Sequence, residues 1–118
     1  MIQDLEIEWL VGPIPIDDHN GKEFIHKVTM LSPNWNNSGQ FYTDANGRQN
    51  VLRQRDYRLD YDLGQAKVDE PVASNYYPIN SWISMGSNHA EKFVTLVTDR
   101  SSGASSIKDN SLEVMIHR

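Results

Sequence analysis

Apolar and polar side chains alternate along much of this chain with a period of two residues. Near its start, Leu5, Ile7 and Trp9 alternate with Glu6 and Glu8. Because successive side chains of a β-strand point to opposite faces, this alternation predicts a strand with one buried face. The same pattern, or a short apolar run, predicts further strands over residues 24–30, 57–63, 82–85, 93–98 and 112–116.

Turn-forming residues separate these segments. Asn46-Gly47 is the strongest turn signal, because both residues tolerate the positive φ angles of a type I′ hairpin turn. We therefore expect Phe41 to Thr43 to pair back on the residues that follow this turn. Residues 32–39, rich in Asn and Ser, are predicted to form a mobile loop with little to bury, and residues 101–106 are predicted to form a second loop.

The chain shows almost no helical periodicity beside these strands. Short strands separated by turns, without a long helix, are typical of antiparallel β-sandwiches and barrels. The 118 residues, of which 38% are hydrophobic, are enough for one core of modest size. We therefore predict an all-β fold, an antiparallel β-sandwich with short turns, with residues 1–118 forming a single domain or a fragment of one.

The net charge argues against nucleic-acid binding. It is formally −5, whereas proteins that bind a phosphate backbone draw most of their affinity from clustered Lys and Arg. The only local basic cluster is interleaved with acids, and we expect these acids to pair with its arginines. Its members are Arg48, Arg53, Arg55 and Arg58, with Asp56, Asp60 and Asp62. The N-terminus lacks a basic region followed by an apolar run, so we also expect no membrane partner.

Metal-binding and nucleophilic patterns are absent. There is no cysteine, and His19, His26, His89 and His117 form no pair with the spacing of a zinc site. We therefore expect no metal site in this chain. The serines around Gly103 lack the G-x-S-x-G pattern of a nucleophile, and the spacing of the acids selects no pair for glycoside hydrolysis. No catalytic residue is predicted.

Aromatic residues offer two kinds of role. Trp9 and Trp82 lie within predicted strands, where core packing is the usual role. Trp35, Tyr76 and Tyr77 are candidates for a platform on which a sugar ring could stack.

Asn36 begins the triplet Asn36-Asn37-Ser38, an acceptor sequence for N-linked glycosylation in a polar loop. A glycan could be attached there without burying any protein surface. The triplet is a weak pointer to the secretory pathway.

Longer motifs also follow one another along the chain. They are EWLVGPIP at residues 8–15, GKE at 21–23, FYTD-x-NGR at 41–48, RDYR at 55–58, EPVA at 70–73, NYYP at 75–78, LVTDRS at 96–101 and LEVM-x-HR at 112–118. In this order and at this spacing they resemble the lysosomal-type α-mannosidases. The resemblance covers nearly the whole chain, and a series of blocks is far more specific than one short motif.

The resemblance implies a retaining α-mannosidase, in which an aspartate attacks the anomeric carbon while zinc, held by His and Asp, binds the sugar hydroxyls. In that family these groups belong to an N-terminal α/β domain, which nothing here matches. We therefore expect a non-catalytic piece of the C-terminal β-rich region, inactive alone, with zinc only in the intact enzyme. The expected partners are the catalytic domain, other segments of the parent enzyme and mannose-containing glycans, in the lysosome or secretory pathway.

The resemblance also implies a role for Arg118, which matches an arginine beside the bound mannose in a related enzyme. We expect Arg118 to shape the edge of the glycone pocket. The chain departs from the family at Asp109-Asn110, where Asp-Gly is usual, and we expect the turn to survive because Asn tolerates the left-handed conformation. It also departs over residues 84–91, and the loop near Asn88 could alter substrate access or a subunit contact.

Two other readings stay open at this point. One is an independent carbohydrate-binding β-sandwich that uses Trp35, Tyr76 or Tyr77. The other is an enzyme whose site is assembled between copies of the chain. If the chain is a slice of a larger β structure, it should expose strand edges and apolar side chains. We therefore expect the isolated chain to self-associate.

Overall fold

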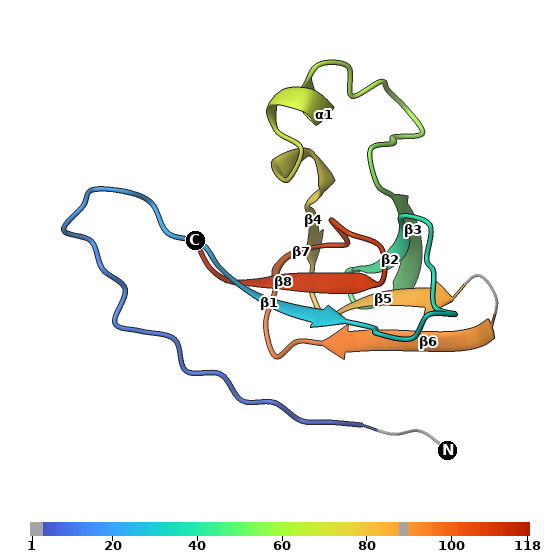
Figure 1. The fold of residues 1–118 in the computed structure, drawn as a ribbon, viewed down its shortest axis with the longest axis horizontal. Coiled ribbons are helices and arrows are strands. Elements are labelled where there is room, and N and C mark those ends of the chain that lie inside the picture. Colours follow the sequence, from blue (N-terminus) through green and yellow to red (C-terminus); the bar gives the residue numbers. More distant parts are fainter. Residues whose placement is uncertain (1–3, 88–89) are drawn as a thin grey trace.

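The computed structural model describes residues 4–87 and 90–118, which form two four-stranded antiparallel sheets (Figure 1). The first sheet has the order β1-β8-β7-β4 and the second has the order β3-β2-β5-β6. The strands are β1 (Phe24–Thr29), β2 (Gln40–Ala45), β3 (Gln49–Gln54), β4 (Tyr77–Ile79), β5 (Trp82–Ser87), β6 (Ala90–Val97), β7 (Ser102–Ser105) and β8 (Ser111–His117). A short helix, α1 (Ala66–Asp69), and a 3₁₀ turn, η1 (Ala73–Asn75), lie between β3 and β4. The prediction of an all-β sandwich is confirmed.

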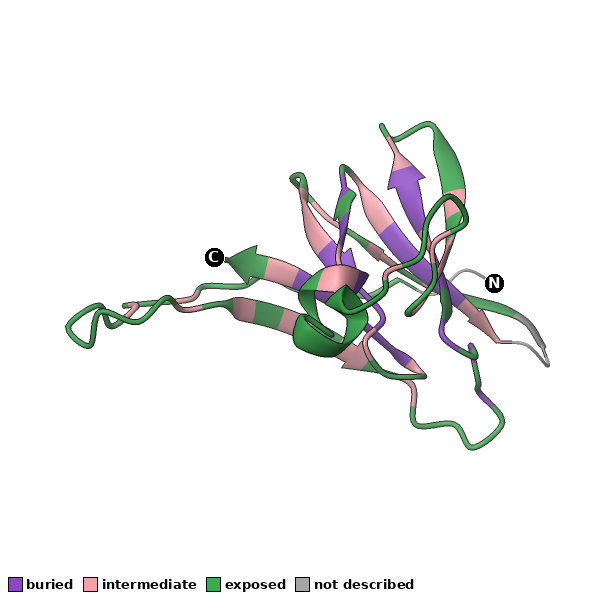
Figure 2. Cartoon of the chain, turned by 90° about the horizontal axis from the view of Figure 1, so that it is seen from above, coloured by how far each residue is buried: buried purple, intermediate pink, exposed green. Residues whose placement is uncertain are grey.

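The hydrophobic core lies between the two sheets, which meet where β2 packs on β4 and β5 packs on β8. In Figure 2 the buried segments gather at this central contact, and the outer ends of the elements are exposed. Burying one large apolar side chain contributes about 1.5–3 kcal/mol, so this cluster is the main source of stability. The buried apolar residues are Trp35, Phe41, Tyr77, Ile79, Ile83, Met85, Ala104, Leu112 and Val114.

Four of the six predicted strands are found, at β1, β5, β6 and β8. The predicted hairpin is also confirmed, since β2 and β3 pair with Phe41 opposite Arg53 and Thr43 opposite Val51. Asn46 and Gly47 both have positive φ in the turn, at 53° and 65°. The turn at Asp109-Asn110 survives as expected, with Asn110 at a φ of 66°.

Two of the predicted strands are wrong. Residues 4–23 run outside both sheets, and Trp9, expected in the core, is about half exposed. Residues 57–63 form an exposed loop between β3 and α1, in which Tyr57, Leu59 and Tyr61 face solvent. Period-two alternation describes a strand only if a neighbouring strand accepts its backbone hydrogen bonds, and neither segment is paired to one.

Both predicted loops are more buried than their composition suggested. Residues 32–39 contain Trp35, which packs in the core, and Asn37, which is fully buried, so the premise that this loop has little to bury is wrong. Within residues 101–106, four residues form β7 and pair with β4 and β8. Small serine side chains let the backbone of this segment enter the sandwich. Asn88 and His89 lie outside the described residues.

Candidate functional site

Arg118 and Glu23 meet at the open end of the first sheet. Phe24 pairs with His117, so the residue after β8 lies beside the residue before β1. The Nε of Arg118 is 3.3 Å from Oε1 of Glu23, and the two side chains are 75% and 51% exposed. Together with Gly21 and Lys22 they line an open hollow of about 560 Å³. An ion pair as exposed as this one contributes little to stability, so its guanidinium is available to a ligand.

Tyr76 and Glu113 form a second polar pair, on the first sheet. Tyr76 Oη donates a hydrogen bond of 2.6 Å to Oε1 of Glu113, whose side chain is buried on β8. Burial raises the pKa of the Tyr76 hydroxyl, and the hydrogen bond to Glu113 and the negative charges of Glu113 and Glu23 raise it further. Tyr76 therefore stays protonated as a donor. Its ring lies over Gly103, where an added Cβ would approach Tyr76 Cδ1 to 3.2 Å.

The other two stacking candidates are packed inside the molecule. Trp35 belongs to the core cluster. The Tyr77 ring is also buried, and the guanidinium carbons of Arg53 and Arg58 lie 4.3 and 4.4 Å from its centroid. Desolvation raises the pKa of Tyr77, against the opposing effect of these two cations. Cation–π contacts already use this ring, so of the three candidates only Tyr76 is partly open.

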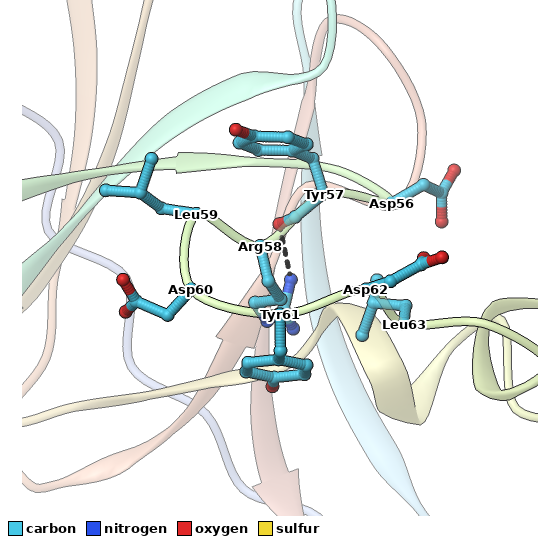
Figure 3. A pocket seen from close by; sticks show the side chains of 8 residues that line it. All are labelled: Asp56, Tyr57, Arg58, Leu59, Asp60, Tyr61, Asp62 and Leu63. Atoms are coloured by element: carbon cyan, nitrogen blue, oxygen red, sulfur yellow. Dashed lines mark hydrogen bonds between the residues drawn. The ribbon is translucent and has the colours of Figure 1, made fainter.

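A second hollow, of about 380 Å³, is formed by residues 56–63 (Figure 3). Figure 3 shows the Tyr57 and Tyr61 rings pointing to different sides of the loop, so one sugar ring could not lie between them. Arg58 fixes the loop from within, donating to the carbonyl oxygens of Tyr57 and Ser74. No sequence pattern singled out Tyr57 or Tyr61 as site residues, because their alternation with polar residues predicted a strand.

The predicted pairing of Asp56, Asp60 and Asp62 with arginines is wrong. Asp56 Oδ1 accepts a hydrogen bond of 2.7 Å from Asn75 Nδ2, and Asp62 Oδ1 accepts one of 2.9 Å from the backbone N–H of Gly64. Within residues 4–87 and 90–118 none of the three forms an ion pair. Asp56 and Asp62 satisfy a side-chain donor and a backbone donor nearby, a use that charge spacing does not reveal.

Asp44, in the FYTD-x-NGR block, is a structural carboxylate. It is 4% exposed. Its Oδ2 accepts from the backbone N–H of Gly47 at 2.7 Å, and its Oδ1 accepts from three successive backbone N–H groups. Those donors are Asn80 at 2.9 Å, Ser81 at 3.1 Å and Trp82 at 3.2 Å. Burial opposes ionisation, but the four donors outweigh it and lower the pKa of Asp44.

Two buried asparagines have a similar role. Asn75, in the NYYP block, accepts from the backbone N–H of Asp56 at 2.8 Å and donates to Asp56 Oδ1 and the Pro71 carbonyl. Asn37 donates to the Gln40 carbonyl at 2.7 Å and accepts from the backbone N–H of Asn110 at 2.8 Å. Each ties together loops that are distant in sequence. The blocks that carry the resemblance are therefore in part fold anchors.

Arg55 joins the same region. It donates to Oδ1 of Asp109 at 2.6 Å, and that oxygen also accepts from the backbone N–H of Gly39 at 3.0 Å. The loop before β2, the end of β3 and the turn before β8 are therefore held at one point.

Zinc does not fit the residues that the structure describes. The described residues contain no group of three or more His, Asp or Glu side chains that could hold a metal ion. His26 lies against Trp9 at a ring separation of 4.3 Å, and His117 lies against Phe24 at 6.1 Å. In the described part of the chain, the helices are also too short and polar to cross a membrane.

Asn36, the predicted glycan acceptor, is exposed in the loop before β2. Its Oδ1 accepts from the backbone N–H of Ser38 at 2.7 Å, which holds the triplet in a tight turn. The neighbouring Asn37 is fully buried, so the two asparagines point in different directions. The structure makes Asn36 accessible, and its modification stays a prediction.

Comparison with known proteins gives consistent matches over almost the full chain. Residues 3–118 match the glycosyl hydrolases family 38 C-terminal domain. The chain is 49% identical over 115 residues to the lysosomal alpha-mannosidase of Homo sapiens, covering 97% of the chain and 10% of that protein. It is also 49% identical over 115 residues to the lysosomal alpha-mannosidase of Bos taurus, with 97% and 11% covered. An alpha-mannosidase of Canavalia ensiformis is 43% identical over 113 residues, with 96% and 11% covered. The chain thus spans about a tenth of the length of these relatives.

Proposed function

The chain belongs to the glycosyl hydrolase family 38 C-terminal domain family, and from this membership we propose that it is the non-catalytic C-terminal β region of an α-mannosidase. In the intact enzyme, which hydrolyses terminal α-D-mannose residues, it packs on the catalytic domain and lends a wall to the glycone pocket. The nucleophile and the zinc ligands belong to other segments of that enzyme. Alone, the chain is inactive.

Arg118 carries the pocket role. It lies at the end of β8 with its guanidinium exposed and in contact with a single carboxylate, Glu23, at the rim of an open hollow. A guanidinium presents several N–H donors in a fixed plane, which suits the hydroxyl oxygens of a sugar. Glu23 limits the rotamers of Arg118 and so orients these donors. Arg118 and Glu23 belong to the LEVM-x-HR and GKE blocks, which the fold brings together although they lie at opposite ends of the chain.

The compartment follows from the same reasoning. The relatives in Homo sapiens and Bos taurus are named lysosomal. A chain without cysteine needs no oxidising environment to fold but tolerates one, and an exposed acceptor at Asn36 fits passage through the secretory pathway. We therefore assign the parent protein to the lysosome, reached through that pathway.

Replacing Arg118 in the full-length α-mannosidase tests this proposal. Loss of a hydrogen bond to a charged donor amounts to about 1.5–3 kcal/mol, so Arg118→Ala should lower kcat/KM by about 10- to 150-fold. Arg118→Lys keeps the charge without the planar donors and should recover only part of the loss. Arg100→Ala is the matched control, because Arg100 is equally exposed and pairs only with its neighbour Asp99. Unchanged kinetics for Arg118→Ala would refute the pocket role.

The reading as an independent sugar-binding module has less support. It needs an open aromatic platform, and Trp35 and Tyr77 are packed in the core. The isolated chain should therefore show no measurable affinity in a titration with mannosides. It should also fail to hydrolyse an aryl α-mannoside with added zinc, and chelator-sensitive hydrolysis would instead support a site assembled between copies.

A further inference from the structure

Residues 4–10, here called the N-terminal arm, have the pattern of a strand without the pairing of one. Leu5, Ile7 and Trp9 alternate with acidic residues, yet the arm belongs to neither sheet. Leu5 is 82% exposed and Leu10 is fully exposed, while Ile7 and Trp9 are about half covered. A segment that is suited to a sheet and left in solvent with its apolar side chains uncovered indicates a binding surface.

Trp9 fixes the side of the molecule on which the arm lies. Its ring packs on His26 of β1 at a centroid separation of 4.3 Å. His26 is paired with Val114, a core residue, so both side chains are on the face of the first sheet that looks toward the second sheet. Trp9 therefore lies on the side of β1 that faces the layer of the second sheet, and Figure 1 shows the start of the chain running outside both sheets.

This layer is incomplete opposite β1. The main contacts between the sheets are β2 with β4 and β5 with β8, and β1 is not among them. The inward side chains of β1, Phe24, His26 and Val28, are accordingly only half buried. The second sheet ends at β6, whose outer edge is unpaired among the described strands. The inward face of β1 therefore leaves apolar surface uncovered, and the unpaired edge of β6 is available to a further strand.

We infer that the N-terminal arm is a strand of an extended second sheet, completed by a strand from the rest of the α-mannosidase polypeptide. The partner strand is extended, with apolar side chains alternating toward β1, and it supplies the backbone hydrogen bonds that the arm lacks. The inference rests on the proposed function, since it names one contact by which this region packs on the intact enzyme. The relatives are about ten times as long as this chain, which leaves ample polypeptide to supply the strand.

Two other occupants fit less well. The free edge of β1 would require the arm to move from the face of the first sheet, where Trp9 is packed on His26. A second copy of the arm would place Glu6 and Glu8 close to the same acids of its partner, and like charges across a strand pair are destabilising. A strand of different sequence avoids both problems.

Amide hydrogen exchange, measured on the full-length enzyme and on the 118-residue chain, tests the inference. Pairing should protect alternate amides of residues 4–10 in the full-length enzyme, slowing their exchange at least about tenfold relative to the isolated chain. Ile7→Ser, on the apolar face, should remove that protection. Glu6→Ser, on the opposite face of the same arm, is the matched control and should leave it.

Three results would overturn the inference. One is an arm that exchanges as fast in the full-length enzyme as in the isolated chain. Another is slow amide exchange of the arm in the isolated chain that does not change with protein concentration, which would show that the arm pairs with β1 of the same molecule. The third is protection that rises with concentration of the isolated chain, which would assign it to a second copy. Arg118 variants affect activity and not arm exchange, so failure of the pocket role and failure of this inference are distinguishable.

Discussion

Asp44 gives the sharpest test of how this sandwich is held together. Its carboxylate accepts four backbone hydrogen bonds, one from the β2–β3 turn and three from the residues leading into β5. Asp44→Ala removes all of these acceptors at once. We expect this variant to be among the least stable single substitutions in the chain.

The expected loss can be worked from these contacts. A hydrogen bond to a charged group contributes about 1.5–3 kcal/mol, and bonds that share two oxygens are not additive. Gly47 and Asn80 are exposed, so their N–H groups can turn to water, whereas Ser81 and Trp82 are partly buried. We therefore expect Asp44→Ala to lower the free energy of unfolding by about 3–5 kcal/mol. Asp44→Asn keeps one acceptor oxygen, but its side-chain NH2 group then faces a backbone N–H, so two donors meet. This variant should lower the free energy of unfolding by about 1.5–3 kcal/mol.

Urea denaturation of the 118-residue chain measures these losses as a shift in midpoint at constant slope. Asp99→Ala is the control, because Asp99 is exposed and paired only with Arg100, and should leave the midpoint unchanged. The pKa of Asp44 is lowered in the folded state. Its stabilisation is therefore complete above the unfolded pKa of about 3.9 and is lost as the pH falls through the folded value. A midpoint unchanged in Asp44→Ala, or a difference from wild type that persists undiminished at pH 2, would refute this account.

Three further predictions concern Asn37, Tyr76 and Asn36. Asn37→Ala removes a local hydrogen bond to the Gln40 carbonyl and the bond from the backbone N–H of Asn110 that joins the loop before β2 to the turn before β8. It should lower the free energy of unfolding, measured in urea, by about 2–4 kcal/mol. Tyr76→Phe leaves the buried Glu113 without its hydrogen-bond donor and should lower the free energy of unfolding by about 1.5–3 kcal/mol. Tyr57→Phe, at an exposed ring, is the control and should leave the free energy of unfolding unchanged. Asn36→Gln, in protein secreted from eukaryotic cells, should remove one glycan's mass by mass spectrometry; an unchanged mass would exclude the site.

Strands were predictable where one face meets the core. In β1 the alternation in sequence matches an alternation in burial. β5 and β8 instead contain consecutive buried residues, and their apolar side chains made them predictable. The same alternation failed in the N-terminal arm and in residues 57–63, where no partner strand is present. Periodicity reports which face a residue would show in a strand, whereas pairing depends on a second segment, which local sequence cannot supply.

Site residues were harder to predict because their roles depend on burial. Trp35 stood in a polar loop and suggested a surface platform, but its large ring is the part of that loop that reaches the core. Asp44, Asn37 and Asn75 carried no signal of their importance, since turn backbones satisfy their oxygens and no motif marks the donors. The pairing of Glu23 with Arg118 could follow only from the register of β1 against β8.

These placements explain why the family was easier to recognise than the site. The blocks FYTD-x-NGR and NYYP include Asp44 and Asn75, each a buried side chain that joins segments distant in sequence through several hydrogen bonds. A substitution at such a position leaves donors unsatisfied, whereas an exposed residue such as Arg118 can change at little cost to folding. Sequence blocks held by the fold identify the scaffold. The chemistry of the pocket requires contacts from the rest of the enzyme, which is why Arg118 and the N-terminal arm must be tested in the full-length protein.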